Sequence, residues 1–369
     1  MDLFRAHGFP PVRVTPSPVI WRYRNRLDFS FGRRFYDTPP PKGFVRETAL
    51  GFRRRGRWFH LLDIRECRIG PAGMDALLLA VRDWVSRSGL SGFDSRTHEG
   101  VLKLLLVREG KRTGERMVVL VTGDGVRNLA AFRDAVLSVY PVDSLHHAIS
   151  QSPAGVAYAE QTIVLHGRAS ISEHLCIPTS GDDRVLRFRI TPFSFFQTNP
   201  LAAEILYSFV RDWVAALSPR LLYDLYGGNG AVAFACADLV PQVVSVESVP
   251  DVQACGEDAV QINGIGNVTF VCAKVEDFLR DRMPAAEAFP DDSAVIVDPP
   301  RAGLHPRALR RLLALRPRHL IYVSCKPEVL ARQEMPALLE HYRVLDARAV
   351  DMFPHTPHVE AVVLFAARP

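Results

Sequence analysis

The stretch Leu221-Leu-Tyr-Asp-Leu-Tyr-Gly-Gly-Asn-Gly230 joins a short apolar strand to a glycine-rich turn. Gly227, Gly228 and Gly230 allow the backbone to turn sharply and to approach a ligand closely. A helical apolar segment follows, and Glu247 ends the next strand, where a carboxylate can accept hydrogen bonds from both hydroxyls of a ribose. The pattern predicts a cofactor site that suits NAD, FAD or S-adenosylmethionine, although a tight turn beside a surface glutamate has the same sequence.

Short apolar strands and helical patterns alternate around this turn. Strands are expected at Leu221–Tyr226, Val243–Val249, Val268–Cys272, Ala294–Pro299 and Leu320–Cys325, and helices at Pro306–Leu315 and Pro327–Leu339. This alternation predicts a doubly wound α/β fold, in which helices cover both faces of a parallel sheet. Tyr342–Phe353 and Val359–Ala366 indicate a terminal hairpin. Because that hairpin stands where a dinucleotide-binding fold would have its second half, S-adenosylmethionine is the favoured cofactor.

The first half of the chain has a different pattern. Strands are expected at Tyr23–Phe31, Leu50–Ile64, Val101–Val107, Met117–Thr122 and Ala157–Leu165. One face of an amphipathic helix is marked by Met74, Leu77, Leu78, Val81, Trp84 and Val85. We therefore predict a smaller α+β domain over residues 1–190 and the doubly wound domain over residues 191–369.

Positive charge is concentrated at the start of the chain. Residues 1–60 hold 13 Lys and Arg against 4 Asp and Glu, whereas the whole chain has a net charge of only +5. Such a segment suits a polyanion, most often nucleic acid, although an arginine-rich genome composition gives the same bias. No uncharged apolar run approaches the ~18 residues of a membrane span, and the N-terminus lacks a secretory pattern. We expect a cytoplasmic protein without membrane contact.

The six cysteines, at positions 67, 176, 236, 255, 272 and 325, do not have the spacing of a metal site. Most of them suit small buried apolar groups. Cys325 differs because it ends a parallel strand, in Ser-Cys-Lys-Pro, at the edge where doubly wound sheets bind their ligands. A helix that begins here is expected to lower the pKa of this thiol and to stabilise its thiolate.

The segment Asp-Met-Phe-Pro-His-Thr-Pro-His-Val-Glu, residues 351–360, combines proline, histidine and acid before an apolar strand resumes. Glu360 is a candidate general base that faces Cys325 across the site. His355 and His358 are expected to shape the loop rather than to bind metal, because no third ligand is evident.

Two further polar side chains belong to the expected ligand edge. In Asp-Pro-Pro-Arg-Ala-Gly, residues 298–303, two prolines stiffen the loop and hold Asp298 at a fixed point. In Phe-Ser-Phe-Phe-Gln-Thr-Asn, residues 193–199, Gln197 lies between aromatic residues, and its amide offers both a donor and an acceptor to a ligand.

Together these motifs resemble the S-adenosylmethionine-dependent RNA uracil-5-methyltransferases, which make 5-methyluridine in ribosomal and transfer RNA. The shared motifs are Tyr-Arg-Asn-Arg (23–26), Phe-Phe-Gln-Thr-Asn (195–199), Asp-Leu-Tyr-Gly-Gly-Asn-Gly (224–230), Asp-Pro-Pro-Arg-Ala-Gly (298–303), Ser-Cys-Lys-Pro (324–327) and the segment 351–360. The resemblance implies a class I methyltransferase (Rossmann-like) sheet, with Cys325 as the nucleophile and Glu360 as the base. It also implies cofactor binding by Gln197, Tyr226, Gly228, Glu247 and Asp298, and substrate binding by Gln197, Asp298, Arg24 and Arg26.

The chain departs from the family pattern in several places. Lys326 replaces the usual asparagine after the nucleophile, and Lys274 occupies a position that is often polar and neutral. Many family members have four cysteines that hold an iron–sulfur cluster. This chain has an equivalent of only one of them, Cys67, so we expect no cluster. The N-terminal β-barrel of many relatives is also expected to be missing. RNA recognition then depends on the basic region that includes Arg53–Arg55 and Arg57.

The resemblance implies methyl transfer to carbon 5 of a uridine through a covalent Cys–uracil intermediate, by a monomer, with ribosomal RNA favoured over transfer RNA as substrate. An amino-group methyltransferase is less well matched, because Arg301 stands where that class has an aromatic residue. RNA cytosine-5 methylation shares the covalent chemistry but has a different motif around its cysteine. A catalytically impaired RNA-binding protein is the non-enzymatic alternative, because of Lys326 and Lys274.

Overall fold

The computed structural model of the chain describes residues 11–38, 40–41, 43–44, 47–54, 56–94, 96–126, 128–152, 157–281 and 289–369. The chain divides into two compact units. The C-terminal unit comprises Met1–Ile20, His174–Phe188 and Ser194–Pro369, and the N-terminal unit comprises Trp21–Glu173 and Arg189–Phe193. The N-terminal unit is thus an insertion in the sequence of the C-terminal unit. The predicted division of functions at residue 190 stays a prediction.

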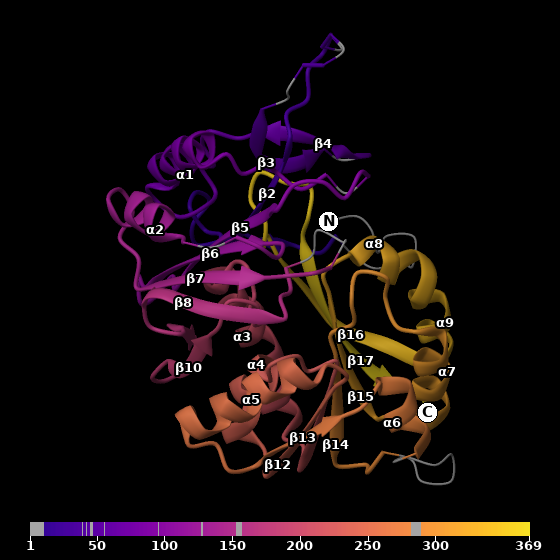
Figure 1. Cartoon of the computed structure of the whole chain (residues 1–369). Helices are drawn as coiled ribbons and strands as arrows, with labels where there is room; N and C mark the ends of the chain where they lie inside the picture. Colours follow the sequence, from indigo (N-terminus) through magenta and orange to yellow (C-terminus); the bar gives the residue numbers. More distant parts are fainter. Residues whose placement is uncertain are drawn as a thin grey trace. The chain divides into compact units, whose positions relative to one another are not determined.

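An eight-stranded sheet forms the C-terminal unit, with the strand order β1-β16-β17-β15-β14-β11-β12-β13 (Figure 1). Its strands are β1 (Val14–Thr15), β11 (Leu221–Leu225), β12 (Gln242–Glu247), β13 (Val268–Cys272), β14 (Ser293–Val297), β15 (His319–Ser324), β16 (Tyr342–Val350) and β17 (Glu360–Ala367). Strands β11 to β15 are parallel, whereas β17 runs antiparallel to both β15 and β16. The predicted doubly wound sheet with a terminal hairpin is confirmed.

Helices cover both faces of this sheet (Figure 1). On one side lie α3 (Pro200–Leu217), α4 (Ala231–Cys236) and α5 (Pro250–Asn263), and on the other α6 (Val275–Asp281), α7 (Pro306–Leu315) and α9 (Met335–His341). Helices α3, α5 and α7 each have a proline in their first turn, where its missing amide costs no hydrogen bond. β14 is buried along its whole length, as expected for a strand that is covered on both faces.

A seven-stranded sheet forms the N-terminal unit, in the order β4-β3-β2-β5-β6-β7-β8. Its strands are β2 (Arg26–Arg33), β3 (Thr48–Arg54), β4 (Arg57–Asp63), β5 (Leu102–Glu109), β6 (Arg116–Thr122), β7 (Ser144–Ile149) and β8 (Gln161–Gly167), and its helices are α1 (Met74–Ser88) and α2 (Ala130–Leu137). All six residues that mark the predicted amphipathic helix are buried on α1, so this prediction is confirmed. A separate pair of strands is formed by β9 (Ile171–Ile177) and β10 (Arg184–Ile190).

The strand pattern of the N-terminal unit differs from the prediction in two ways. The stretch expected as one strand, Leu50–Ile64, forms most of the β3–β4 hairpin, whose turn contains Gly56 at a φ of +75°. Strand β7 has no predicted counterpart, and neither have β9 and β10, most of whose residues belong to the C-terminal unit. In β7, His146 and His147 interrupt the apolar run, yet both are buried, with ring nitrogens 2.7 and 2.8 Å from serine and threonine hydroxyls.

Within the described residues, no helix combines the length and the apolar character that crossing a membrane requires. The first seven residues, on which the prediction about a secretory pattern depends, lie outside the described residues. Arg55, a member of the predicted basic region, lies outside them too.

Asn199 joins three segments of the C-terminal unit. Its side-chain oxygen accepts a hydrogen bond from the Ala202 amide at the start of α3, at 3.3 Å. Its side-chain nitrogen donates to the Ser17 hydroxyl at 3.1 Å and to the Met352 carbonyl at 3.0 Å. This single buried amide therefore connects the N-terminal end of α3 to the segment that precedes β17.

Replacing Asn199 by Ala should lower the free energy of unfolding by about 2 kcal/mol, because it removes a helix cap and leaves the Met352 carbonyl without its donor. Urea unfolding, followed by circular dichroism, measures this change. Asn199→Asp keeps the cap but puts a buried carboxylate oxygen beside the Met352 carbonyl, so it should be at least as destabilising as Asn199→Ala. Equal stability of all three proteins would contradict this account.

Candidate active site

The register between β15 and β17 brings Cys325 and Glu360 together. Ser324 pairs with Ala361 in this antiparallel ladder. Cys325 follows Ser324 and Glu360 precedes Ala361, so the two residues stand opposite each other one step further along. Side chains directly opposite in an antiparallel pair lie on the same face, with Cβ atoms ~5 Å apart. Glu360 is held from its other side by pairing with Val350 of β16.

Glu360 is almost completely buried, with an exposed fraction of 4%. Burial raises the pKa of its carboxyl group to about 8, and the charge of Asp298 adds to this rise, while Arg301 opposes it. Burial likewise raises the pKa of the Cys325 thiol to about 11, again with contributions from Glu360 and Asp298 and against the effect of Arg301. These four side chains therefore form one electrostatically connected group.

The predicted lowering of the Cys325 pKa by a helix N-terminus is wrong. The helix after Cys325 is α8 (Pro327–Val329), a single turn that continues as a π-helical segment, Leu330–Glu334. The helical segment continues without a gap into α9 (Met335–His341), and its N-terminal dipole does not outweigh the other effects on this thiol. Burial and two neighbouring carboxyl groups dominate instead, so the thiol is protonated at neutral pH.

Asp298 lies immediately after β14, and its amide donates to the Leu225 carbonyl at the end of β11 at 3.2 Å. Burial raises the pKa of Asp298 to about 7. Asp224, on β11, is fully buried, and its pKa is also raised to about 7 by burial and by Asp298. A Cβ atom on Gly227 would lie 2.9 Å from an Asp224 carboxylate oxygen, which explains why the turn needs glycine here.

The glycine-rich turn positions the Glu247 carboxylate. Its Oε2 accepts a hydrogen bond from the Gly228 amide at 3.2 Å, and its Oε1 accepts from the amides of Ser248 and Val249 at 2.6 and 2.8 Å. Gly228 and Gly230 have φ values of +57° and +79°, the left-handed region that favours glycine. The carboxylate at the end of β12 is thus fixed beside the turn that follows β11.

Tyr226 stands between β11 and the turn, with a φ of +63°. Its ring packs against the core of the C-terminal unit. Burial raises the pKa of its hydroxyl to about 12, while the nearby His305 backbone opposes this rise. The hydroxyl is therefore directed towards the residue that caps α7, and the predicted contact of Tyr226 with a cofactor stays a prediction.

Tyr207, which the sequence analysis missed, belongs to the same site. It is a fully buried residue of α3, and a hydrogen bond joins its hydroxyl to the Gln197 side chain. Burial, together with the charges of Asp298 and Glu360, raises its pKa well above the ordinary tyrosine value. Tyr207 therefore connects Gln197 to the two carboxyl groups. Only its buried position in an apolar helix was visible in the sequence, and that pattern is shared by any core tyrosine.

Two of the predicted substrate-binding residues belong to the other unit. Arg24 and Arg26 belong to the N-terminal unit, where the Arg26 guanidinium forms two hydrogen bonds with Asp28, at 2.9 and 2.8 Å. Their role in substrate binding stays a prediction. Lys326, the departure next to the nucleophile, has an exposed side chain at the start of α8.

The histidines of the segment 351–360 are parts of a turn. His355 has a φ of +67°, and the ring of His358 lies edge-on to Phe353, with 6.3 Å between centroids. A search of the described residues finds no group of three or more His, Cys, Asp or Glu side chains that could hold a metal ion.

The arrangement can support covalent catalysis. A thiol that stands opposite a carboxyl group provides a nucleophile and a proton acceptor. A second carboxyl group, Asp298, and the amide of Gln197 adjoin them through Tyr207. Two carboxyl groups with pKa values near 7 and 8 can exchange protons at neutral pH.

Comparisons with known proteins agree with this geometry. A family model described as tRNA (uracil-5-)-methyltransferase matches residues 155–368. An uncharacterized RNA methyltransferase of Caldanaerobacter subterraneus is 33% identical over 95% of this chain and 74% of the relative, and another, of Chlorobaculum tepidum, is 33% identical over 96% and 74%. A crystal structure of Pyrococcus abyssi tRNA (uracil-54, C5)-methyltransferase in complex with S-adenosyl-L-homocysteine is similar over 99% of this chain and 81% of that one, with 30% identity and a TM-score of 0.73.

The family match covers more than half of the chain, and the relatives are aligned over nearly all of it. The fold of the C-terminal unit is the methyltransferase fold of the Pyrococcus enzyme. The chain belongs to the family of S-adenosylmethionine-dependent RNA uracil-5-methyltransferases.

Proposed function

We propose that this protein methylates carbon 5 of a uridine in RNA through a covalent bond between the Cys325 sulfur and carbon 6 of the base. The observation that carries the proposal is the β15–β17 register, which sets Cys325 opposite Glu360 at the carboxyl end of the parallel strands. Ligands of doubly wound sheets bind at this edge.

The residues beside the glycine-rich turn suit S-adenosylmethionine. Glu247 Oε1 accepts three hydrogen bonds, from the amides of Ser248 and Val249 and the Ser248 hydroxyl, whereas Oε2 accepts one, from Gly228. Oε2 thus retains acceptor capacity for ribose hydroxyls. We assign Glu247 and Gly228 to the nucleoside, and Gln197, Tyr226 and Asp298 to the rest of the cofactor. When bound, the cofactor supplies the electrophilic methyl group.

Cys325 and Glu360 divide the chemistry between them. Carbon 5 of uracil is a poor nucleophile, and attack of the Cys325 thiolate on carbon 6 moves an electron pair towards carbon 5. Once carbon 5 has been methylated it still carries its hydrogen. Glu360 takes this proton, the electron pair returns to the 5,6 double bond, and the bond to sulfur breaks. A positioned base of this kind contributes ~10²–10⁴-fold to the rate.

The first proton transfer is also assigned to this group. The Cys325 thiol, with a pKa of about 11, has to lose its proton before it attacks. Asp298, with a pKa of about 7, is the more ionised of the two carboxyl groups at neutral pH and is therefore assigned as the acceptor of this proton. Binding of a substrate that excludes water makes such a transfer possible within one closed site.

We propose ribosomal RNA as the substrate, because the segments 195–199 and 351–360 resemble the ribosomal branch of the family. Transfer RNA is the second candidate, favoured by the similarity to the Pyrococcus tRNA (uracil-54, C5)-methyltransferase. A uridine that reacts at both ring carbons has to leave its stack, so a loop or a flipped-out uridine is the expected target in either RNA.

Replacing Cys325 by Ala should abolish methylation, because no nucleophile remains, and should leave S-adenosylmethionine binding intact. Release of tritium from 5-tritiated uridine measures the reaction, on ribosomal RNA and on transfer RNA in parallel, and calorimetry measures cofactor binding. Cys67→Ala is the matched control, since this thiol lies in the N-terminal unit, and it should retain full activity. Turnover by Cys325→Ala would remove the nucleophile assignment.

Glu360→Gln should instead trap the covalent intermediate, because the carbon 5 proton can no longer be removed. The adduct is visible as a slowly migrating protein–RNA band on a denaturing gel. Full activity of Glu360→Gln without such a band would exclude Glu360 as the base.

Removing the Tyr207 hydroxyl in Tyr207→Phe should lower the turnover rate roughly 10-fold, because Gln197 loses the partner that orients it. The ring remains, so the fold should be retained. Tyr342→Phe is the control, since Tyr342 is an equally buried tyrosine of the same unit outside the site. If both variants show the same rate, Tyr207 has no positioning role.

The site should also make stability depend on pH. The pKa values of Asp298 and Glu360 are raised in the folded chain, to about 7 and about 8. At pH values between the ordinary carboxyl pKa and these raised values, the folded state therefore binds more protons than the unfolded state. Their contribution to stability is therefore fully present below the ordinary carboxyl pKa of ~4, is lost progressively as the pH rises above it, and is gone above the folded values of about 7 and about 8. Thermal unfolding of Asp298→Asn/Glu360→Gln should show a smaller loss over this range than the unchanged protein. An identical loss in both would contradict the raised pKa values.

A further inference from the structure

A stacked aromatic pair lies at the edge of the N-terminal sheet. The rings of Phe35 and His60 are 3.9 Å apart between centroids, with 29° between their planes. His60 belongs to β4, the edge strand, and a bridge between Arg34 and Leu61 holds the segment after β2 beside it. Phe35 is 38% exposed, although a phenylalanine in a structural role is usually buried. The pair thus presents flat aromatic surface at the margin of the sheet.

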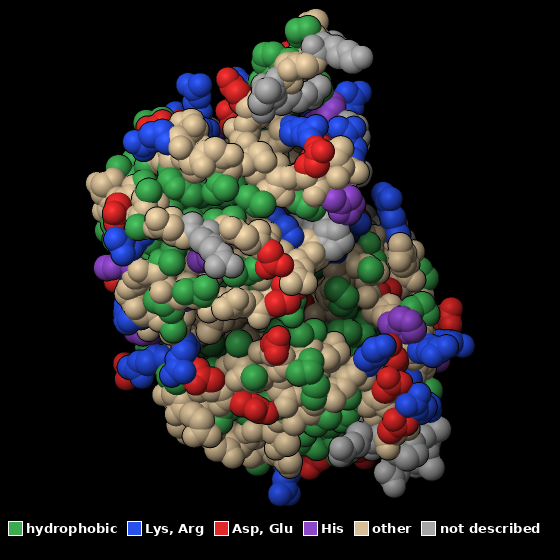
Figure 2. Space-filling model, in the orientation of Figure 1, with side chains coloured by type: hydrophobic (Ala, Val, Ile, Leu, Met, Phe, Trp, Pro, Cys, Tyr) green, Lys and Arg blue, Asp and Glu red, His purple; other side chains and the backbone are tan. Residues whose placement is uncertain are grey.

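Positive charge surrounds this pair. Arg54, Arg57 and Arg96 each lower the pKa of His60, in addition to the effect of burial, so the imidazole is neutral at neutral pH. Arg54 and Arg57 are exposed, and they form no ion pair with any described residue. Lys and Arg side chains gather with a histidine over this end of the unit in Figure 2.

Other arginines of the same sheet are neutralised. Arg33 pairs with Glu99, and Arg34 with Glu47 at 2.6 Å. Arg96 is 3.8 Å from Asp94. Among the described residues, Arg54 and Arg57 thus carry charge that no ion pair compensates, at the tip of the β3–β4 hairpin next to the aromatic pair.

We propose that Phe35 and His60 stack against an unpaired base of the substrate RNA, while Arg54 and Arg57 contact the adjoining phosphates. We name these four residues the stacking platform. The inference rests on the proposed RNA substrate and adds a contact with a nucleotide other than the methylated uridine, because the platform and the candidate active site belong to different units.

The chemistry of the platform favours a single strand over other polyanions. Aromatic rings stack on bases only where these are unpaired and exposed, and the arginines supply the charge that follows the backbone. In a duplex the base faces are covered, so only the phosphate contacts would remain. An acidic protein or an anionic membrane would likewise engage the arginines but would gain nothing from the ring of Phe35.

The test compares binding of the full chain to a short fluorescein-labelled oligouridine, followed by fluorescence anisotropy at several salt concentrations. Phe35→Ala and His60→Ala should each weaken binding about 10-fold and leave its salt dependence unchanged, because stacking involves no charge. Arg54→Gln/Arg57→Gln should weaken binding and reduce the slope of log affinity against log salt by about 1.4, the value for two phosphate contacts on a single strand. Binding to the same oligouridine annealed to oligoadenosine should not change in Phe35→Ala.

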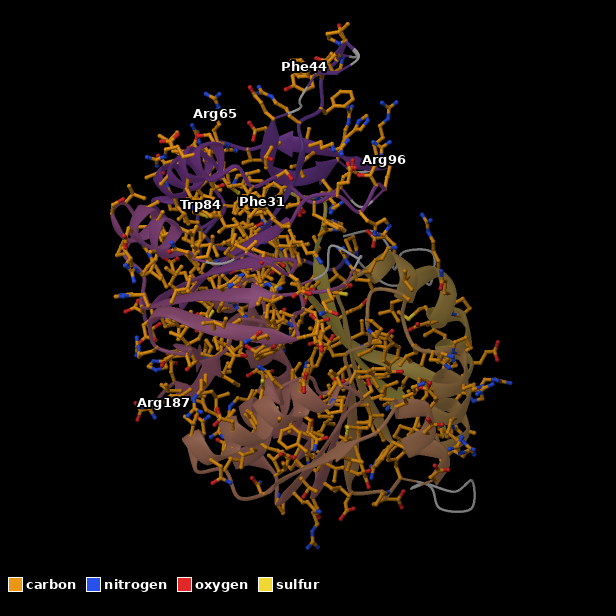
Figure 3. All side chains as sticks on the ribbon, in the orientation of Figure 1. Phe31, Phe44, Arg65, Trp84, Arg96 and Arg187 are labelled. Atoms are coloured by element: carbon orange, nitrogen blue, oxygen red, sulfur yellow. The ribbon has the colours of Figure 1, made fainter. Side chains whose placement is uncertain are left out.

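Two variants of the same unit are the controls. Tyr158 is an exposed aromatic residue and Arg65 an exposed arginine without a described partner, and both lie outside the platform. Figure 3 shows Arg65 on the side of α1, whereas Arg96 lies near the β3–β4 hairpin. Tyr158→Ala and Arg65→Gln should bind oligouridine as the unchanged protein does. Thermal unfolding checks that each variant is folded.

If Phe35→Ala and His60→Ala bind oligouridine as tightly as Tyr158→Ala does, the stacking platform is excluded. Equal losses on oligouridine and on the duplex would also exclude it, since they would indicate a purely electrostatic surface. Failure of the proposed function can be distinguished from failure of the stacking platform. It would appear as absence of tritium release by the unchanged protein, whether or not Phe35→Ala weakens binding to oligouridine.

Discussion

The antiparallel pairing of β17 with β15 is the constraint on which the site depends. A parallel strand at this place would put its first residue at the far edge of the sheet, but an antiparallel one begins where β15 ends. Ser324 opposite Ala361 then fixes Cys325 opposite Glu360, and a slip of one residue would turn Glu360 to the other face. Pairing of β17 with β16 on its other side holds the register against such a slip. Backbone hydrogen bonds, rather than contacts between the side chains themselves, therefore set the catalytic geometry.

Burial determines the protonation states of the candidate active site. Burial of Glu360 and partial burial of Asp298 and Cys325 raise the pKa of all three groups towards or above neutrality. The proposed nucleophile, Cys325, is thus held in its unreactive thiol form, and the charge of Arg301 favours the charged forms of Cys325 and Glu360. A thiolate is more readily oxidised or alkylated than a thiol, so a half-buried and protonated Cys325 is less exposed to such side reactions.

Much of the C-terminal unit could be predicted from its sequence. The bounds of β13 and α7 were predicted as observed, because short apolar runs and an initial proline are local signals. The resemblance to the family supplied Cys325 and Glu360 as a pair. The pKa of Cys325 and the membership of Tyr207 could not be predicted, since each depends on burial and on charges from segments that are distant in the chain. The β3–β4 turn was missed because arginines on both sides of Gly56 hid its signal.

The shortest strand of the large sheet has a consequence for biosynthesis. β1 pairs Val14 with Ala349 and Thr15 with Val350, so a strand made early in translation cannot pair until one of the last strands has been made. The inserted N-terminal unit contains its own sheet and can fold while translation continues. The sheet that carries the nucleophile closes only when the ribosome has delivered the final hairpin. A nascent chain that stalls before residue 342 would therefore lack both the partner of β1 and the strand that brings in Glu360.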